Sequence, residues 1–247
     1  MAELQFVGMV FESVIIVIAF IFLVMILMRY YEKKHQLTFY LFVIFLFYII
    51  AIIFSWLSKI LVLYSGIDYV YNSVIPDPNT PISWVLLRIT DFRLSFVFLT
   101  IAIYLSYILK VNIFEKGYNK GERIIVIIYF LFTALFSLII YQRGNTLIDA
   151  FAFLFVFIFM AMIYFPFFVR SYQSFKSTGD KVFKKAFLSL ALMSIFYILV
   201  PLNFLIDRIL ILLGGVGFSP FYFLAWIFVI LGIIGAYFGY IRPKSKQ

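Results

Sequence analysis

The chain has 247 residues, of which 66% are hydrophobic and 22% aromatic, and its mean hydropathy is +1.12. Soluble proteins are nearer half apolar, so this composition excludes a water-soluble globular domain and predicts an integral membrane protein. The formal net charge of +9 does not indicate a nucleic-acid partner, because the basic residues stand at the ends of hydrophobic segments, where membrane topology accounts for them.

The residue content also limits the chemistry that the chain can perform. There is no cysteine and His35 is the single histidine, which excludes disulfides, iron–sulfur clusters, cysteine–zinc sites and multi-histidine metal or haem sites. The sequence has no closely spaced pair of carboxylates, no Ser–His arrangement and no phosphate-binding loop. We therefore expect neither an enzyme nor a bound cofactor.

Seven apolar runs follow one another along the chain, each long enough to cross a hydrocarbon core of about 30 Å as an α-helix. The first run ends at Arg29 without a small-residue cleavage site, so we expect a retained helix and not a signal peptide. The predicted fold class is all-α, a single integral membrane domain over residues 1–247. The expected transmembrane helices cover residues 6–28, 37–63, 82–109, 124–141, 146–169, 182–206 and 220–241.

Proline marks two features of this layout. The connection 64–81 contains three prolines, which bar a regular helix, so we expect an ordered or capping loop there. Pro201 falls inside the sixth expected helix, where its ring removes one backbone hydrogen bond and predicts a kink.

The segments between the helices differ in basic charge. Four of them hold 3, 4, 5 and 3 of the 20 lysines and arginines, and they are 29–36, 110–123, 170–185 and the tail from Arg242. Because cytoplasmic loops carry the excess of Lys and Arg, we expect these segments inside, the N-terminus outside and the C-terminus in the cytoplasm. The chain is thus predicted to be a multi-pass protein of the cell membrane.

Eight ionisable residues, four acids and four bases, reach a similar depth on the predicted outer side. They are Glu12, Lys59, Arg88, Asp91, Arg93, Asp149, Asp207 and Arg208. An ionised side chain inside a bilayer costs a few kcal/mol or more unless it faces protein or water. Two hypotheses follow: an outward-open pocket for a small polar or anionic ligand, or a structural network of ion pairs that ties the helix ends together.

The third expected helix, 82–109, carries the strongest candidates. Arg88 and Asp91 are three residues apart and share a helix face, which continues through Ser95, Ala102 and Ser106. Arg93 points about 140° away from Arg88 and needs another partner. Asp91 and Arg93 are the two for which a ligand role is favoured over a structural one.

A second polar face is expected beside Pro201, where Asn203 and Asp207 are four residues apart on a kinked helix. Arginine guanidinium groups in such a pocket suit a carboxylate or a phosphate. The candidate ligand-binding residues are Glu12, Lys59, Arg88, Asp91, Arg93, Asn203 and Asp207.

The basic segment 170–185 predicts contact with the membrane surface. Its lysines and arginine are expected to attract anionic lipid of the inner leaflet, in addition to the surrounding bilayer. The alternative is that a cytoplasmic protein docks on 170–185.

Two families resemble parts of this pattern. Arg88-Ile-Thr-Asp91-Phe resembles the Arg-Tyr-x-Asp-Trp of the third helix of microbial rhodopsins, where the aspartate is the counter-ion of the retinal Schiff base. The seventh expected helix, 220–241, has no lysine to form that Schiff base, which argues against a retinal protein. The seven-helix, N-out layout is similar to the membrane sensor regions that precede histidine kinases and cyclase-type output domains in prokaryotes.

The leading functional hypothesis is a seven-helix membrane sensor or receptor-like protein. It would bind a small polar ligand in the outer charged pocket and signal to a separate cytoplasmic partner, with no output domain on this chain. The alternatives are a transporter or an ion or proton conduit, and a non-catalytic subunit of a membrane complex.

Overall fold

The computed structural model describes residues 2–65, 80–115, 117–140 and 145–242, and every regular element in these ranges is a helix. Seven of the helices are long and apolar enough to cross a membrane, which confirms the all-α, seven-span prediction for the described residues. The elements are α1 (Ala2–Lys33), α2 (Gln36–Tyr64), α3 (Pro81–Thr90), α4 (Arg93–Phe114), α5 (Lys120–Ile139), α6 (Thr146–Ser177), α7 (Lys181–Leu212), α8 (Pro220–Ala236) and a π-helical turn, η1 (Tyr237–Ile241).

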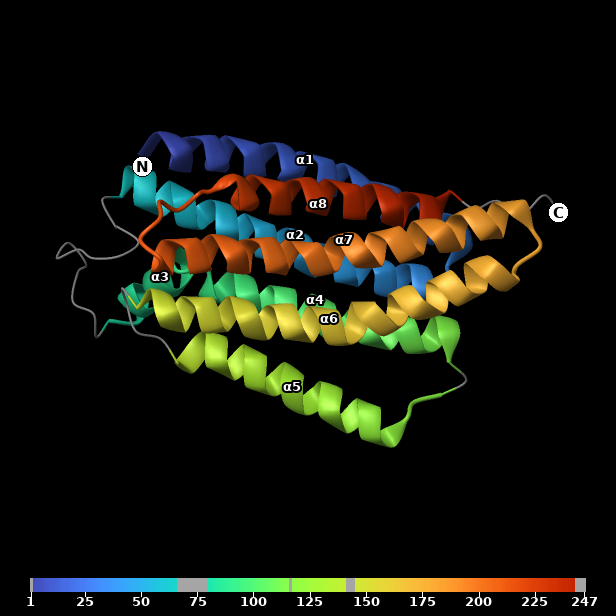
Figure 1. The fold of residues 1–247 in the computed structure, drawn as a ribbon. Coiled ribbons are helices and arrows are strands. Elements are labelled where there is room, and N and C mark those ends of the chain that lie inside the picture. Colours follow the sequence, from blue (N-terminus) through green and yellow to red (C-terminus); the bar gives the residue numbers. More distant parts are fainter. Residues whose placement is uncertain (1, 66–79, 116, 141–144, 243–247) are drawn as a thin grey trace.

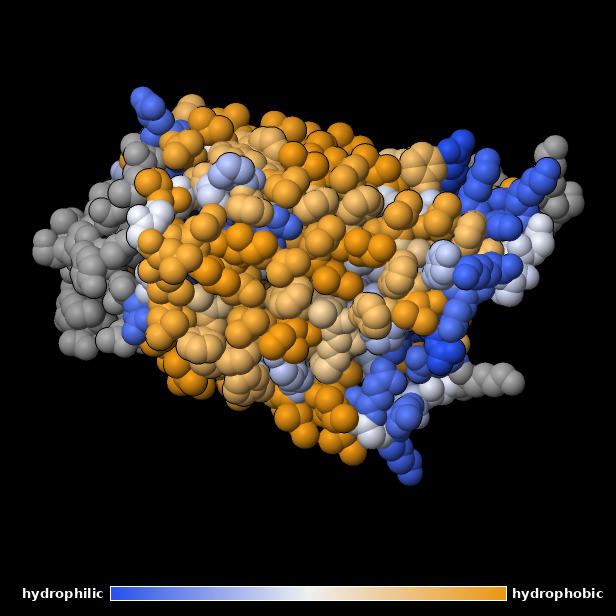
Figure 2. All heavy atoms as spheres, in the orientation of Figure 1, coloured by the Kyte–Doolittle hydropathy of each residue, from blue (hydrophilic) through white to orange (hydrophobic). Residues whose placement is uncertain are grey.

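The long helices lie side by side in one elongated bundle (Figure 1). The most extensive contacts join α6 to α7, α7 to α8, α2 to α4, and α1 to α2, whereas α5 lies on the outside against α4 and α6. We call the end of the bundle where α1 begins the N-terminal end, and the opposite end, where η1 closes the described chain, the C-terminal end. Figure 2 shows a wide apolar band between the two ends, with hydrophilic residues gathered at the C-terminal end.

The third predicted helix is not continuous, which corrects the expectation for 82–109. It is divided into α3 and α4 at Asp91 and Phe92, because Phe92 adopts a left-handed backbone with φ of 61°. The carbonyl of Thr90 accepts a hydrogen bond of 2.6 Å from Ser58 Oγ on α2. As a result Arg88 and Asp91 precede the membrane-spanning helix, which begins at Arg93.

Several helices are also longer than predicted, and the connections between them are shorter. The expected basic loop 170–185 consists of the end of α6 and the start of α7, joined by Thr178–Asp180. Asp180 caps α7, because its Oδ1 accepts a 2.6 Å hydrogen bond from the backbone N–H of Val182. We refer to residues 170–185 as the basic hairpin. Most of the predicted loop 64–81 lies outside the described residues.

Small residues allow α8 and η1 to approach α7 closely. A Cβ atom on Gly232 would overlap the ring of Tyr197, and one on Gly235 would lie 3.1 Å from the carbonyl oxygen of Ser189. Small residues at such positions let membrane helices pack backbone to backbone, where dispersion forces are strongest.

We predict that Gly232→Ala destabilises the bundle although alanine favours a helix. Overpacking against Tyr197 costs about 1–3 kcal/mol, and the gain in helix propensity of about 1 kcal/mol offsets only part of it. The measurement is thermal unfolding of the protein in lipid nanodiscs. The matched control is Gly121→Ala in α5, where a Cβ meets only Asn119 Oδ1 at 3.5 Å. An equal response of both variants would contradict the close α7–α8 contact.

Candidate functional site

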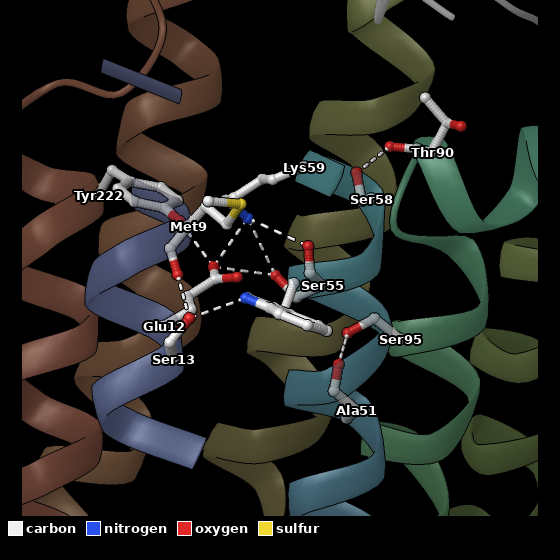
Figure 3. A network of polar contacts seen from close by, with 11 residues as sticks. Met9, Glu12, Ser13, Ala51, Ser55, Ser58, Lys59, Thr90, Ser95 and Tyr222 are labelled. Atoms are coloured by element: carbon white, nitrogen blue, oxygen red, sulfur yellow. Dashed lines mark hydrogen bonds and ion pairs between the residues drawn. The ribbon is translucent and has the colours of Figure 1, made fainter. Parts of the chain in front are cut away.

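The most deeply buried ion pair joins α1 and α2 near the N-terminal end (Figure 3). Lys59 Nζ lies 2.7 Å from Glu12 Oε1, and both side chains are 0% exposed. The same carboxylate oxygen accepts hydrogen bonds from Tyr222 on α8 at 2.6 Å and from Ser55 on α2 at 3.1 Å. Removing two charges from water is costly, so this dense set of partners is what makes the burial of the pair tolerable.

Aromatic rings complete the surroundings of the Lys59 ammonium group. Its nitrogen lies 4.9 Å from the ring centre of Phe92 and 5.4 Å from that of Tyr222. Lys59 Nζ also donates to the backbone oxygen of Ser55 at 3.2 Å. The left-handed turn at Phe92 thus places a ring over the ammonium group, so the break between α3 and α4 belongs to the same site.

A second pair joins α4 to α6. Arg93 Nη2 lies 2.5 Å from Asp149 Oδ1, and Arg93 is 0% exposed. Arg93 stands in the first turn of α4 and Asp149 in the first turn of α6, so the pair fastens the N-terminal ends of two spanning helices. Buried arginine at membrane depth is expected to be paired in this way.

The other predicted site residues make local contacts. Asp207 Oδ1 accepts a 2.8 Å hydrogen bond from the backbone N–H of Ser219, just before α8, and Asn203 Nδ2 donates to the oxygen of Leu199 at 2.7 Å. Arg88 Nε donates to the carbonyl oxygen of Leu138 on α5 at 2.8 Å. Asp91 is half-buried in the turn between α3 and α4. These contacts hold helix ends in place.

A cavity of about 100 Å³ lies between the helices and extends from this network toward the middle of the bundle. Its walls come from α1, α2, α4, α6, α7 and α8 and are mainly apolar and aromatic. None of the seven candidate residues lines the cavity, but Ser55 and Tyr222, which hydrogen-bond to Glu12, do. The charged network therefore lies behind the cavity wall and holds two of its lining residues in place.

Among the described residues that line the cavity, Arg208 is the charged one, and it was not among the predicted site residues. Its guanidinium carbon lies 5.4 Å from the ring centre of Phe92 and 5.3 Å from that of Phe153. Both rings also line the cavity. In the sequence, Arg208 differs from the other outer cations in no visible way, because its surroundings come from two distant segments.

A group of hydroxyls in the middle of the bundle also escaped prediction. The hydroxyls of Tyr48 and Tyr164 lie 2.7 Å apart, and that of Tyr164 lies 2.9 Å from Ser106 Oγ. The ring of Tyr197 packs against both tyrosines, with centroids 5.6 Å and 5.3 Å away. Three helices, α2, α4 and α6, are thus joined by hydrogen bonds away from the charged end.

The described residues contain no group of three or more His, Cys, Asp or Glu side chains that could hold a metal ion. Comparison of the chain with protein-family models, with curated proteins and with solved structures found no match. The class that the fold defines is a helical, membrane-type bundle of seven candidate spans.

We predict strong coupling between Glu12 and Lys59. Lys59→Met alone leaves a buried carboxylate without its cation, which costs about 3–5 kcal/mol, whereas Glu12→Gln with Lys59→Met removes both charges and recovers much of this loss. The measurement is thermal unfolding in lipid nanodiscs.

The control for this double-mutant comparison is Glu32→Gln. It breaks the Arg29–Glu32 pair, in which Glu32 is 60% exposed, and we expect little change in unfolding temperature. Additive effects of the two substitutions at Glu12 and Lys59 would contradict the coupling.

Proposed function

We propose that the protein is a receptor-like membrane sensor of the cell membrane that binds a small molecule in the central cavity. The observation that carries this proposal is that α6 and α7 both line the cavity and both continue to the basic hairpin at the C-terminal end. A ligand that changes the packing of these two helices would change the position of the hairpin. The pocket expected among the outer charges is replaced in this proposal by the cavity beside them.

Pro201 supplies the point at which α7 can bend. It lines the cavity and lies inside an unbroken helix of 32 residues, where its ring removes a backbone hydrogen bond. A ligand shifts an equilibrium only by its difference in affinity for two states. In this mechanism the two states differ in the bend at Pro201, and the ligand favours the bend that fits its shape.

The basic hairpin is the proposed output. Its basic side chains are all exposed, and they are Arg170, Lys176, Lys181, Lys184 and Lys185. With the positive-inside orientation they meet anionic lipid headgroups in the cytoplasmic leaflet. In the receptor proposal, a cytoplasmic protein with an acidic surface competes with that lipid for the hairpin and thereby reads its position.

A proton conduit is the second candidate. It is favoured by the linked hydroxyls of Tyr48, Tyr164 and Ser106, because Tyr48 also lines the cavity. Proton flux into liposomes that contain the protein, lost on Tyr164→Phe, would support the conduit over the receptor.

We predict that filling the cavity moves the basic hairpin. Because the chain has no cysteine, spin labels can be placed at Gly117→Cys and Gly179→Cys, where a Cβ meets nothing within 4 Å. Double electron–electron resonance spectroscopy then measures the distance between the label in the α4–α5 connection and the label in the hairpin. Ala51→Leu, which fills the cavity from α2, is expected to shift this distance by about 2 Å or more, and the added substitution Pro201→Ala to suppress the shift.

The control pair for this measurement is Lys33→Cys with Gly117→Cys, which leaves out α6 and α7 and is expected to stay unchanged. Ile49→Phe serves as a second filling variant if Ala51→Leu does not fold. A hairpin distance that is the same in the wild type and in both filled variants would overturn the receptor proposal.

A further inference from the structure

We infer that the cavity binds a small organic carboxylate, and that Arg208 is the residue that holds its anionic group. This inference rests on the proposed function, which requires only that the cavity accepts some small molecule. It adds the chemical class of the ligand and the residue that selects it. The seven candidate ligand-binding residues of the sequence analysis are not needed for this selection.

The first argument is the distribution of ion pairs. Lys59 and Arg93 each have a carboxylate partner, at 2.7 Å and 2.5 Å. Among the described residues, no carboxylate lies within ion-pair distance of Arg208. Asp207, the next residue along α7, directs its Oδ1 to the backbone N–H of Ser219 instead.

The second argument is the setting of the Arg208 guanidinium group. Arg208 is half-buried, and its guanidinium group lies beside the rings of Phe92 and Phe153, which limit the orientations that it adopts. A guanidinium group presents five N–H donors in a planar fork that matches the two oxygens of a carboxylate. Stacking on the rings leaves the edges of this fork available for such a contact.

The third argument comes from one buried donor in the cavity wall. Trp226 is 4% exposed and lines the cavity, and its ring centre lies 5.4 Å from that of Phe204, one helical turn before Arg208. The Trp226 indole nitrogen has no hydrogen-bond partner among the described residues. An indole N–H only donates, so an occupant that carries oxygen would satisfy it.

The rest of the wall defines the body of the ligand. The lining between these polar groups is aliphatic and aromatic, with Phe96, Met160 and Phe204 among its members. A volume of about 100 Å³ is smaller than the engineered apolar cavity of about 150 Å³ that accepts benzene. The ligand is therefore smaller than a benzene ring with a carboxylate, which leaves a short-chain acid.

Charge favours a carboxylate over a phosphate ester. A phosphate dianion needs more than one cation, but Lys59 and Arg93 are already neutralised by Glu12 and Asp149. Within the described part of the chain, Arg208 has no carboxylate at ion-pair distance but also attracts the Asp149 carboxylate from further away, so it balances a monoanion better than a dianion.

The test compares propionate with propionamide, which have nearly the same shape but differ in charge. Binding to the full chain in nanodiscs is measured by titration of tryptophan fluorescence and by the shift in unfolding temperature. We expect propionate to bind about tenfold more tightly than propionamide, and Arg208→Gln to remove this preference while propionamide binding stays within about twofold. Arg88→Gln, at the same end but away from the cavity, is the matched control and should change neither affinity.

The outcomes separate the inference from the proposed function. If both compounds bind equally to the wild type and to Arg208→Gln, the carboxylate inference is overturned while a small-molecule cavity stands. If neither compound binds at any soluble concentration, both are overturned. Arg208→Lys, which keeps the charge but loses the planar guanidinium group, is the second variant and should show an intermediate preference for propionate.

Discussion

The high cost of leaving a charge unpaired in a bilayer is the constraint on which the N-terminal end of the bundle depends. Glu12 and Lys59 are both fully buried, and each neutralises the charge of the other across 2.7 Å. Tyr222 hydrogen-bonds to the same carboxylate and lines the cavity, so the pair also fixes α8 and one wall of the cavity. The helices around the cavity are thus joined by the Glu12–Lys59 ion pair at one end and by the hydrogen bond between the Tyr48 and Tyr164 hydroxyls further along.

Much of the fold is predictable from the sequence, because the length and continuity of an apolar run decide whether a helix can cross a bilayer. Two features are not. At the break at Asp91 and Phe92, the hydroxyl of Ser58 on α2 donates a hydrogen bond to the carbonyl of Thr90. This partner is distant in the sequence, so the local sequence pattern does not predict the break. The extensions of α6 and α7 into the basic hairpin depend on helix propensity and the Asp180 cap, outside the apolar runs.

For the candidate site, the sequence predicts which charges need partners but not which residues those partners are. Depth in an apolar run correctly indicates that charges such as Arg93 need protein partners, yet it does not identify them, because pairing depends on which helices are neighbours. Arg208 becomes distinct only when the rings of Phe92 and Phe153 are brought beside it. The ligand roles of the seven candidate residues remain predictions. Six of them have contacts that account for their positions without a ligand, and Asp91 is held in the turn between α3 and α4.

The central claim is that the cavity is a ligand site selected by Arg208, and native mass spectrometry tests it most directly. The chain is extracted gently from its own membranes and its mass is compared with the mass that the sequence predicts. We expect a bound small organic anion on the wild type and on Arg88→Gln, lost from Arg208→Gln and from Ala51→Leu. A bare chain in every variant, or a stoichiometric protein partner without any small molecule, would contradict the claim.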